Sequence, residues 1–179
     1  LPEVGVATLK LFMAYKGTSF YCDDEAILNA MMRAKEAGVT MMVHAENADI
    51  ITILTNHYLS QGKTSPVYHY HARPPIAEEE ATGRAIALAK AADCPLFVVH
   101  VSAKEAMEAI REAHNQGWPI FGETCTHYLT LTTDYLDKPG FEGAKYICSP
   151  PLRPQEHVDA MWHAVREGWL TAVGSDHCA

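Results

Sequence analysis

The strongest constraint on the fold is an alternation between short apolar runs and longer stretches with helical character. The apolar runs have strand length and are often bounded by Gly or Pro. Continuous apolar runs of this kind are typical of parallel strands that are covered on both faces. The runs that we expect to form strands are residues 8–14, 39–44, 96–101, 120–124, 145–148 and 171–175.

Helical patterns separate these runs. Residues 23–37 carry acidic side chains in the first turn and are followed by Gly38, which are ordinary start and stop signals. Ser102 and Glu105 have the spacing of a capping box, so we expect them to open a helix. The polar loop 62–75 is longer than a simple connection, so we expect it to shape a site. The other expected helices are residues 45–59, 77–92 and 154–167, with one short turn at 132–136.

Strands alternating with helices predict an α/β fold. No glycine-rich phosphate loop follows the first strand, which disfavours a doubly wound nucleotide-binding sheet. A TIM-type (β/α)8 barrel needs about 250 residues. We therefore expect one partial domain over residues 1–179, an incomplete barrel with roughly the fourth to eighth strands and their helices. Because strong elements lie close to both ends, we expect the chain to be the interior of a longer protein.

Composition excludes several classes of protein. Hydrophobic residues make up 48% and charged residues 20%, which is typical of a globular domain. The net charge is −8, so no basic surplus exists for a nucleic-acid partner. The apolar runs are too short to cross a bilayer, and no secretion signal is visible. The five cysteines are scattered without a CxxC pair, which indicates reduced thiols and a cytoplasmic protein.

Ionisable residues follow three of the apolar runs. His44 and His100 each end one run, and Asp176 follows another. Active sites of barrels lie at the carboxyl ends of the strands, and two imidazoles with a carboxylate suit Zn²⁺ or a similar ion. Each residue alone is explained by ordinary hydrogen bonding, but the three together favour a metal site.

Lys10 lies inside the first apolar run rather than at its end. Its neighbours on both faces of the expected strand are apolar, so we expect Lys10 to be buried. A buried lysine is costly unless it is paired or modified. Two kinds of chemistry use such a residue: a Schiff base, or conversion to an anion that binds metal.

Six motifs occur in order along the whole chain. Together they resemble the D-hydantoinase/dihydropyrimidinase family of cyclic amidohydrolases, within the amidohydrolase superfamily. No single motif is decisive, but the ordered set is specific. The motifs are KLFMAYKG (10–17), VHAEN (43–47), FVVHVSAKEA (97–106), GETCTHYL (122–129), CSPPLR (148–153) and GSDHC (174–178).

The resemblance implies a binuclear metal site. Lys10 matches the family's fourth-strand lysine, which is carbamylated and bridges two divalent ions, expected to be Zn²⁺. His44 and His100 match the two histidines that bind the second ion. Asp176 matches the aspartate after the eighth strand, which binds the first ion and shuttles a proton. A carbamate suits this role because it replaces a buried ammonium with an anion that has two oxygens.

The resemblance also implies the reaction. Tyr15 matches the tyrosine that hydrogen-bonds the substrate oxyanion, and Ser149 matches the serine whose main chain holds the amide edge of the substrate. The expected function of the parent is to open the cyclic amide of hydantoins or dihydropyrimidines by attack of a metal-bridged hydroxide. The expected partners are a small cyclic amide and identical subunits in a homotetramer, without nucleic acid or membrane.

One part of the family pattern is missing. The first strand of the family carries an HxH pair, and no such pair precedes Lys10. His69 and His71 fit the pattern only as text, because they lie in the polar loop 62–75. We therefore expect the isolated chain to be inactive. The downstream substrate loop of the family is also absent.

Other interpretations stay open at this stage. An allantoinase-like or dihydroorotase-like amidohydrolase, a non-catalytic scaffold relative and a Schiff-base enzyme that uses Lys10 are the alternatives. Glu123 and His127 either support the metal ligands or make ordinary hydrogen bonds. The histidines on helical patterns are expected at the surface; these are His57, His114, His157 and His163.

Overall fold

The computed structural model describes residues 2–177 and shows one parallel sheet of five strands in sequence order. Each strand pairs with the next one along the chain, as in a continuous arc of a (β/α)8 barrel. This confirms the expected α/β fold and the expected share of the barrel. The strands are β1 (Thr8–Phe12), β2 (Thr40–His44), β3 (Leu96–Val98), β4 (Ile120–Cys125) and β5 (Ala172–Gly174).

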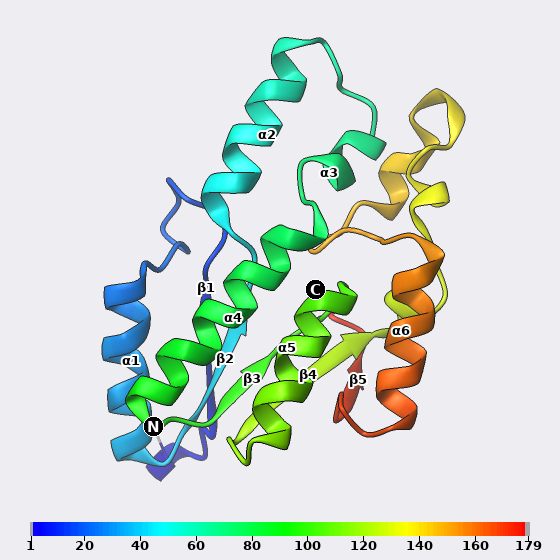
Figure 1. Ribbon diagram of the computed structural model, residues 1–179. Helices are drawn as coiled ribbons and strands as arrows, with labels where there is room; N and C mark the ends of the chain where they lie inside the picture. The colour runs from blue at the N-terminus through cyan, green and yellow to red at the C-terminus, as the bar shows by residue number, and fades with distance from the viewer. Residues whose placement is uncertain (1, 178–179) are drawn as a thin grey trace.

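Helices cover one face of the sheet. Figure 1 shows α1, α4, α5 and α6 side by side in front of the strands, while α2 and α3 extend beyond the upper edge. The helices are α1 (Asp24–Ala37), α2 (Ala48–Ser60), α3 (Val67–His71), α4 (Pro75–Ala92), α5 (Lys104–Asn115) and α6 (Gln155–Arg166). The 3-10 segments are η1 (Pro2–Val4), η2 (Thr126–Leu129), η3 (Thr133–Tyr135) and η4 (Pro139–Tyr146). No helix within residues 2–177 combines the length and the apolar character needed to cross a bilayer.

The strand expected at residues 145–148 does not form. Lys145 and Tyr146 end η4, and the chain then continues without regular structure. The place beside β4 is taken by β5, whose Ala172 pairs with Glu123. Gly140 and Phe141 both have positive φ, which turns the backbone within η4. The sheet therefore has no position for a sixth strand here.

The two faces of the sheet differ in burial. Alternate residues such as Met41, Val43 and Leu96 point into the helix layer and are fully buried. Burial of such a side chain contributes roughly 1.5–3 kcal/mol. The opposite face carries Lys10 and Phe97, and within the described residues no helix covers it. The main core therefore lies between the sheet and the helices.

Lys10 is exposed, so its expected burial is wrong for this chain. Apolar residues lie beside Lys10 on both faces of the strand, but β1 lies at the edge of the sheet with only β2 beside it. The Lys10 side chain lies on the uncovered face, next to the ring of Phe12. Whether this side chain is buried thus depends on the segments that lie beside β1 and over this face, and not on the sequence of residues 8–14 alone.

The amino terminus of α5 is capped by other elements. Its N-cap is Ala103, and the Ser102 hydroxyl instead donates a hydrogen bond to the carboxylate of Glu78 in α4. The Glu78 carboxylate also accepts the Ser102 and Ala103 N–H groups, and His157 of α6 accepts the Lys104 N–H at 3.0 Å. The predicted capping box is therefore wrong. The surface position predicted for His157 is also wrong, because this residue is buried.

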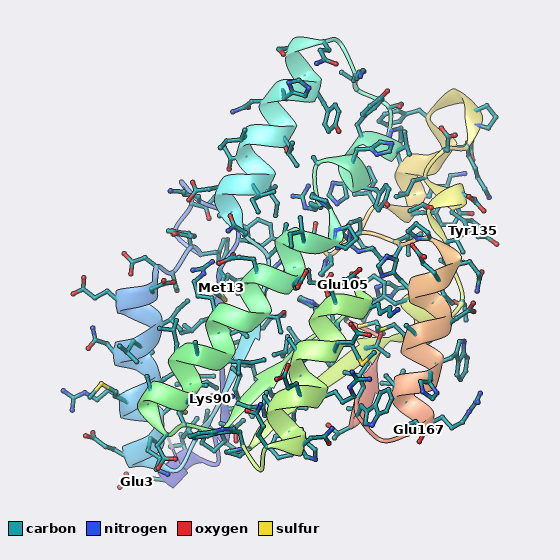
Figure 2. The ribbon with its side chains drawn as sticks, viewed as in Figure 1. Glu3, Met13, Lys90, Glu105, Tyr135 and Glu167 are labelled. Carbon is teal, nitrogen blue, oxygen red and sulfur yellow. The ribbon has the colours of Figure 1, made fainter. Side chains whose placement is uncertain are left out.

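The strands and helices run in opposite directions, so the two ends of the molecule differ. Figure 2 shows Glu3, Lys90 and Glu167 near the amino ends of the strands, and Met13 and Glu105 near the carboxyl ends. The loops that follow the strands gather at the second end. In barrels this end carries the chemistry.

Candidate metal centre

His44 and His100 come together at the carboxyl edge of the sheet. His44 is the last residue of β2, and His100 lies two residues after β3. The centroids of their rings are 4.5 Å apart, and both side chains are buried. Parallel neighbouring strands end at the same edge, which explains why residues far apart in sequence meet here. The two histidines singled out from the sequence thus form one cluster.

Hydrogen bonding selects the free nitrogens of this pair. His44 Nε2 lies 2.7 Å from Oε2 of the buried Glu46, which leaves Nδ1 as the nitrogen available to a cation. His100 Nδ1 is buried without a hydrogen-bond partner. Burial first, and then the neighbouring His44 and Lys10, holds the pKa of His100 well below its usual value. A neutral imidazole is the form that binds metal.

Lys10 lies on the neighbouring strand β1, two residues before Phe12, whose partner in β2 is His44. Its charge acts on His100 and on Glu123, whose pKa is raised by burial and Asp176 and lowered by Lys10. Among the described residues, no group of three His, Cys, Asp or Glu side chains is arranged to hold a metal ion. Two imidazoles alone are too few, and an ammonium is not a ligand. The donor set fits a cation once Lys10 supplies carbamate oxygens.

Tyr15 and Ser149 lie at one side of the histidine pair. The Tyr15 ring is 5.2 Å from the His44 ring, centroid to centroid. Burial and the charge of Glu46 raise the pKa of Tyr15, while a hydrogen bond with Ser149 lowers it. The hydroxyl therefore stays protonated at neutral pH and can donate a hydrogen bond. The two residues assigned to substrate binding are thus neighbours.

Asp176 lies two residues after β5 and is exposed. Its charge contributes to the raised pKa of Tyr15, after burial and Glu46, and to that of Glu123, after burial. The pKa of His127 is lowered by burial, and Asp176 opposes this shift. Asp176 therefore acts on the same end of the sheet as the other candidates. The end of the GSDHC motif at Cys178 lies outside the described residues.

Three of the candidate residues have positive φ without being glycine. The values are 66° for Tyr15, 44° for His100 and 49° for Asp176. Such conformations cost on the order of 1–3 kcal/mol and are concentrated at functional sites. These residues stand out in the sequence, but nothing in the sequence marks their backbone conformation.

His69 and His71 lie in the helix α3, so the expectation that residues 62–75 form only a loop is wrong, and the two histidines do not join the metal centre. His69 Nε2 lies 2.8 Å from the Cys148 carbonyl oxygen, and its Nδ1 lies 3.2 Å from Arg73. Both ring nitrogens are therefore engaged, while His71 is exposed and packs against tyrosine rings. This agrees with the rejection of this pair as the missing HxH.

Sequence reasoning missed a set of buried charges behind the site. Glu46 is fully buried beside His44, and Arg73 lies 3.8 Å from it as an ion pair. Arg153 is buried with Glu78 at 2.9 Å. An acid directly after an apolar strand, as in VHAEN, is the signal that would have found Glu46. Nothing local in the sequence marks Arg153 as buried.

The fold is that of the amidohydrolase barrel enzymes. The solved dihydropyrimidinase of Brevibacillus agri superposes with a TM-score of 0.95 and 51% identity, over 98% of this chain and 38% of that one. The D-hydantoinase of Streptomyces coelicolor is 52% identical over 178 residues, which are 99% of this chain and 38% of the relative. These 179 residues therefore belong to the D-hydantoinase/dihydropyrimidinase family, as the six motifs predict.

The chain spans about 38% of the length of these relatives. A protein named allantoinase, from Rubrobacter xylanophilus, is less similar, with 38% identity over 97% of this chain and 38% of its own length. No family model matches the chain.

Proposed function

We propose that the chain is a segment of a metal-dependent cyclic amidohydrolase that opens hydantoins or dihydropyrimidines. The observation that carries the proposal is the pair of buried imidazoles, His44 and His100, 4.5 Å apart at the carboxyl edge of the sheet. Lys10 lies on the adjacent strand β1, and its charge lowers the pKa of His100, after burial and His44. The 52% identity with a D-hydantoinase supports the substrate class.

Together with Asp176, these residues suit two divalent cations, and we propose Zn²⁺. Lys10 as a carbamate would bridge the two ions, His44 and His100 would hold one of them, and Asp176 would hold the other. When bound, such ions polarise an amide carbonyl and lower the pKa of a water ligand. The depressed pKa of His100, due first to burial, keeps its ring free of a competing proton.

The remaining residues act on the substrate. The Tyr15 hydroxyl donates a hydrogen bond to the oxygen that becomes negative when the ring amide is attacked. Asp176 accepts the proton of the attacking water and delivers it to the ring nitrogen, which leaves as the C–N bond of the amide breaks; this is general acid–base catalysis. The main chain at Ser149 holds the amide edge of the ring next to Tyr15. These roles together orient one cyclic amide at the strand ends.

We also propose a cellular compartment and a subunit number for the enzyme. The cysteines at positions 22, 94, 125 and 148 are free, which supports a cytoplasmic enzyme. We also propose a homotetramer, because the resemblance implies one, without a nucleic-acid or membrane partner. Sedimentation of the purified full-length parent measures the subunit number directly.

The test is ring opening by the full-length parent, with hydantoin, dihydrouracil and allantoin as competing substrates. We expect kcat/KM for hydantoin or dihydrouracil to exceed that for allantoin by at least about tenfold, which is 1.4 kcal/mol of discrimination. Removal of metal should abolish turnover, and borohydride should trap no adduct on Lys10. A preference for allantoin, or a trapped adduct, would refute the proposal.

A further inference from the structure

The loop at residues 148–153 carries Ser149 and is held from two directions. Its far end is fixed by Arg153, which contacts Glu78 at 2.9 Å and the Ser102 hydroxyl at 3.1 Å. These contacts are buried in the body of the molecule. The Tyr128 hydroxyl also donates a hydrogen bond to the carbonyl of Pro150, on the same side of Ser149 as Arg153. These contacts leave the near end of the loop, at Cys148, to be held by another residue.

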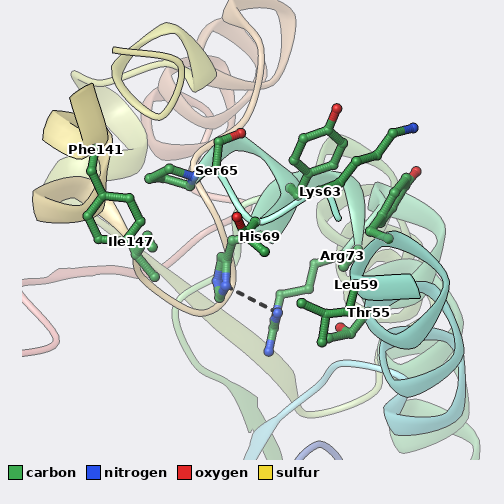
Figure 3. Close-up of a pocket in the computed structure, with 13 residues that line it drawn as sticks. Thr55, Leu59, Lys63, Ser65, His69, Arg73, Phe141 and Ile147 are labelled. Carbon is green, nitrogen blue, oxygen red and sulfur yellow. Dashed lines mark hydrogen bonds between the residues drawn. The ribbon is translucent and has the colours of Figure 1, made fainter. Parts of the chain in front are cut away.

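His69 of α3 supplies this contact. Its Nε2 lies 2.8 Å from the Cys148 carbonyl oxygen and 3.2 Å from the Ser149 hydroxyl. Figure 3 shows His69 and Arg73 pointing toward each other across a hydrogen bond, in a cavity also lined by Ile147. The imidazole therefore links Arg73, four residues after His69 in the chain, to the loop at Cys148, which is 79 residues after His69.

Arg73 determines which ring nitrogen of His69 carries the proton. A guanidinium only donates hydrogen bonds, so the Nδ1 atom that faces it must accept. The proton of the neutral ring then sits on Nε2, which donates to the Cys148 carbonyl. Burial and the charge of Arg73 lower the pKa of His69 to about 4, against the hydrogen bond to Cys148. The ring is therefore neutral at the pH of the cytoplasm.

We propose that His69 is a positioning residue for the substrate, which acts by fixing the main chain at Cys148 and Ser149 through an Nε2–H donor oriented by Arg73. This inference rests on the function proposed above, in which Ser149 holds the amide edge. It assigns to His69 a role in substrate binding that is separate from the metal ligands. Loosening this contact should weaken substrate binding more than it slows the chemical step.

The experiment compares variants of the metal-loaded full-length parent. His69→Ala should raise KM for dihydrouracil about tenfold, the effect of losing one hydrogen bond, with kcat changed less than about threefold. His69→Gln should restore KM, because the Gln amide N–H reaches the same place as Nε2–H. His69→Asn should not restore it, because its amide lies where Nδ1 lay. His71→Ala, on the same helix and exposed, is the control and should match wild type.

Zinc content per subunit provides the second readout and should equal that of wild type in every variant. If wild type is active and KM is unchanged in His69→Ala and His69→Asn, the inference on His69 is overturned while the proposed function stands. Loss of zinc in these variants would also overturn it, because His69 would then act on the metal centre. If His69→Ala fails to fold, the comparison of the Gln and Asn variants decides. A zinc-loaded wild type without ring opening would overturn the proposed function and the inference with it.

Discussion

Tyr15 combines a left-handed backbone with a ring that lies next to the His44 ring and a hydroxyl that is hydrogen-bonded to Ser149. Tyr15→Phe removes only the hydroxyl, so we expect the parent to lose about 10²-fold in kcat, the usual effect of removing an oxyanion donor. Zinc content should stay unchanged. Tyr58→Phe, on the distant helix α2, serves as the control. A Tyr15→Phe variant that loses zinc but keeps its rate per bound zinc would show that the assigned role is wrong.

His157 makes stability depend on pH. Its Nδ1 accepts the Lys104 N–H, and burial lowers its pKa. The unfolded chain therefore binds this proton at a higher pH than the folded one. The stabilisation that the neutral His157 gives to the folded chain is fully present above the unfolded pKa of about 6.5. It is lost as the pH falls toward the lower pKa of the folded chain, and the free energy of unfolding then changes by at most about 1.4 kcal/mol per pH unit.

His157→Asn keeps an acceptor near the Nδ1 position but does not titrate. We expect the Tm of the parent to fall less between pH 7 and pH 5 in this variant than in wild type. Thermal unfolding at both pH values measures the difference. Equal falls in Tm would contradict a neutral, capping His157.

At the scale of the elements, the buried Arg153–Glu78 pair ties the Ser149 loop to α4 and to the start of α5. Arg153→Ala would leave the Glu78 carboxylate buried without its partner. We expect a loss of about 3–5 kcal/mol in the free energy of unfolding. Arg33→Ala, which removes an exposed pair with Glu36, should change it by less than about 1 kcal/mol. Denaturant unfolding measures both, and equal small losses would contradict the argument.

The same elements show how far local sequence signals reach. The helix over residues 23–37 was predicted well because its signals are local: Asp23 accepts the Ala26 N–H, and Gly38 adopts φ 67°. The cap of α5 was missed because Glu78 and His157 come from other helices. Helix ends that are capped by distant residues leave no pattern in the local sequence.

For the site, prediction succeeded where a residue follows an apolar run. His44, His100 and Asp176 follow their strands, and the sheet order brings the two histidines together. The contacts of Glu46 and His69 depend on how loops fold over that edge, which spacing alone does not determine. The burial of Lys10 was mispredicted because it depends on neighbours that the 8–14 run does not specify.

At the scale of the whole molecule, the uncovered sheet face predicts how the 179 residues behave alone. Phe97 and Phe121 lie on this face without full burial. An open sheet with unpaired edge strands tends to associate with other chains. We expect the isolated chain to aggregate, to bind at most one zinc weakly and to open no ring. Light scattering and zinc analysis of the isolated chain measure this, and a stable monomer with two tightly bound zincs would contradict it.

The central claim is that Lys10, as a carbamate, completes a metal centre with His44 and His100. The most direct measurement is zinc content and dihydrouracil opening for the full-length parent and its Lys10→Ala variant, with and without a short carboxylic acid. We predict two zincs and turnover for wild type, the loss of both in Lys10→Ala, and partial recovery when the acid replaces the missing oxygens. Full zinc content and full turnover of Lys10→Ala without added acid would contradict the claim.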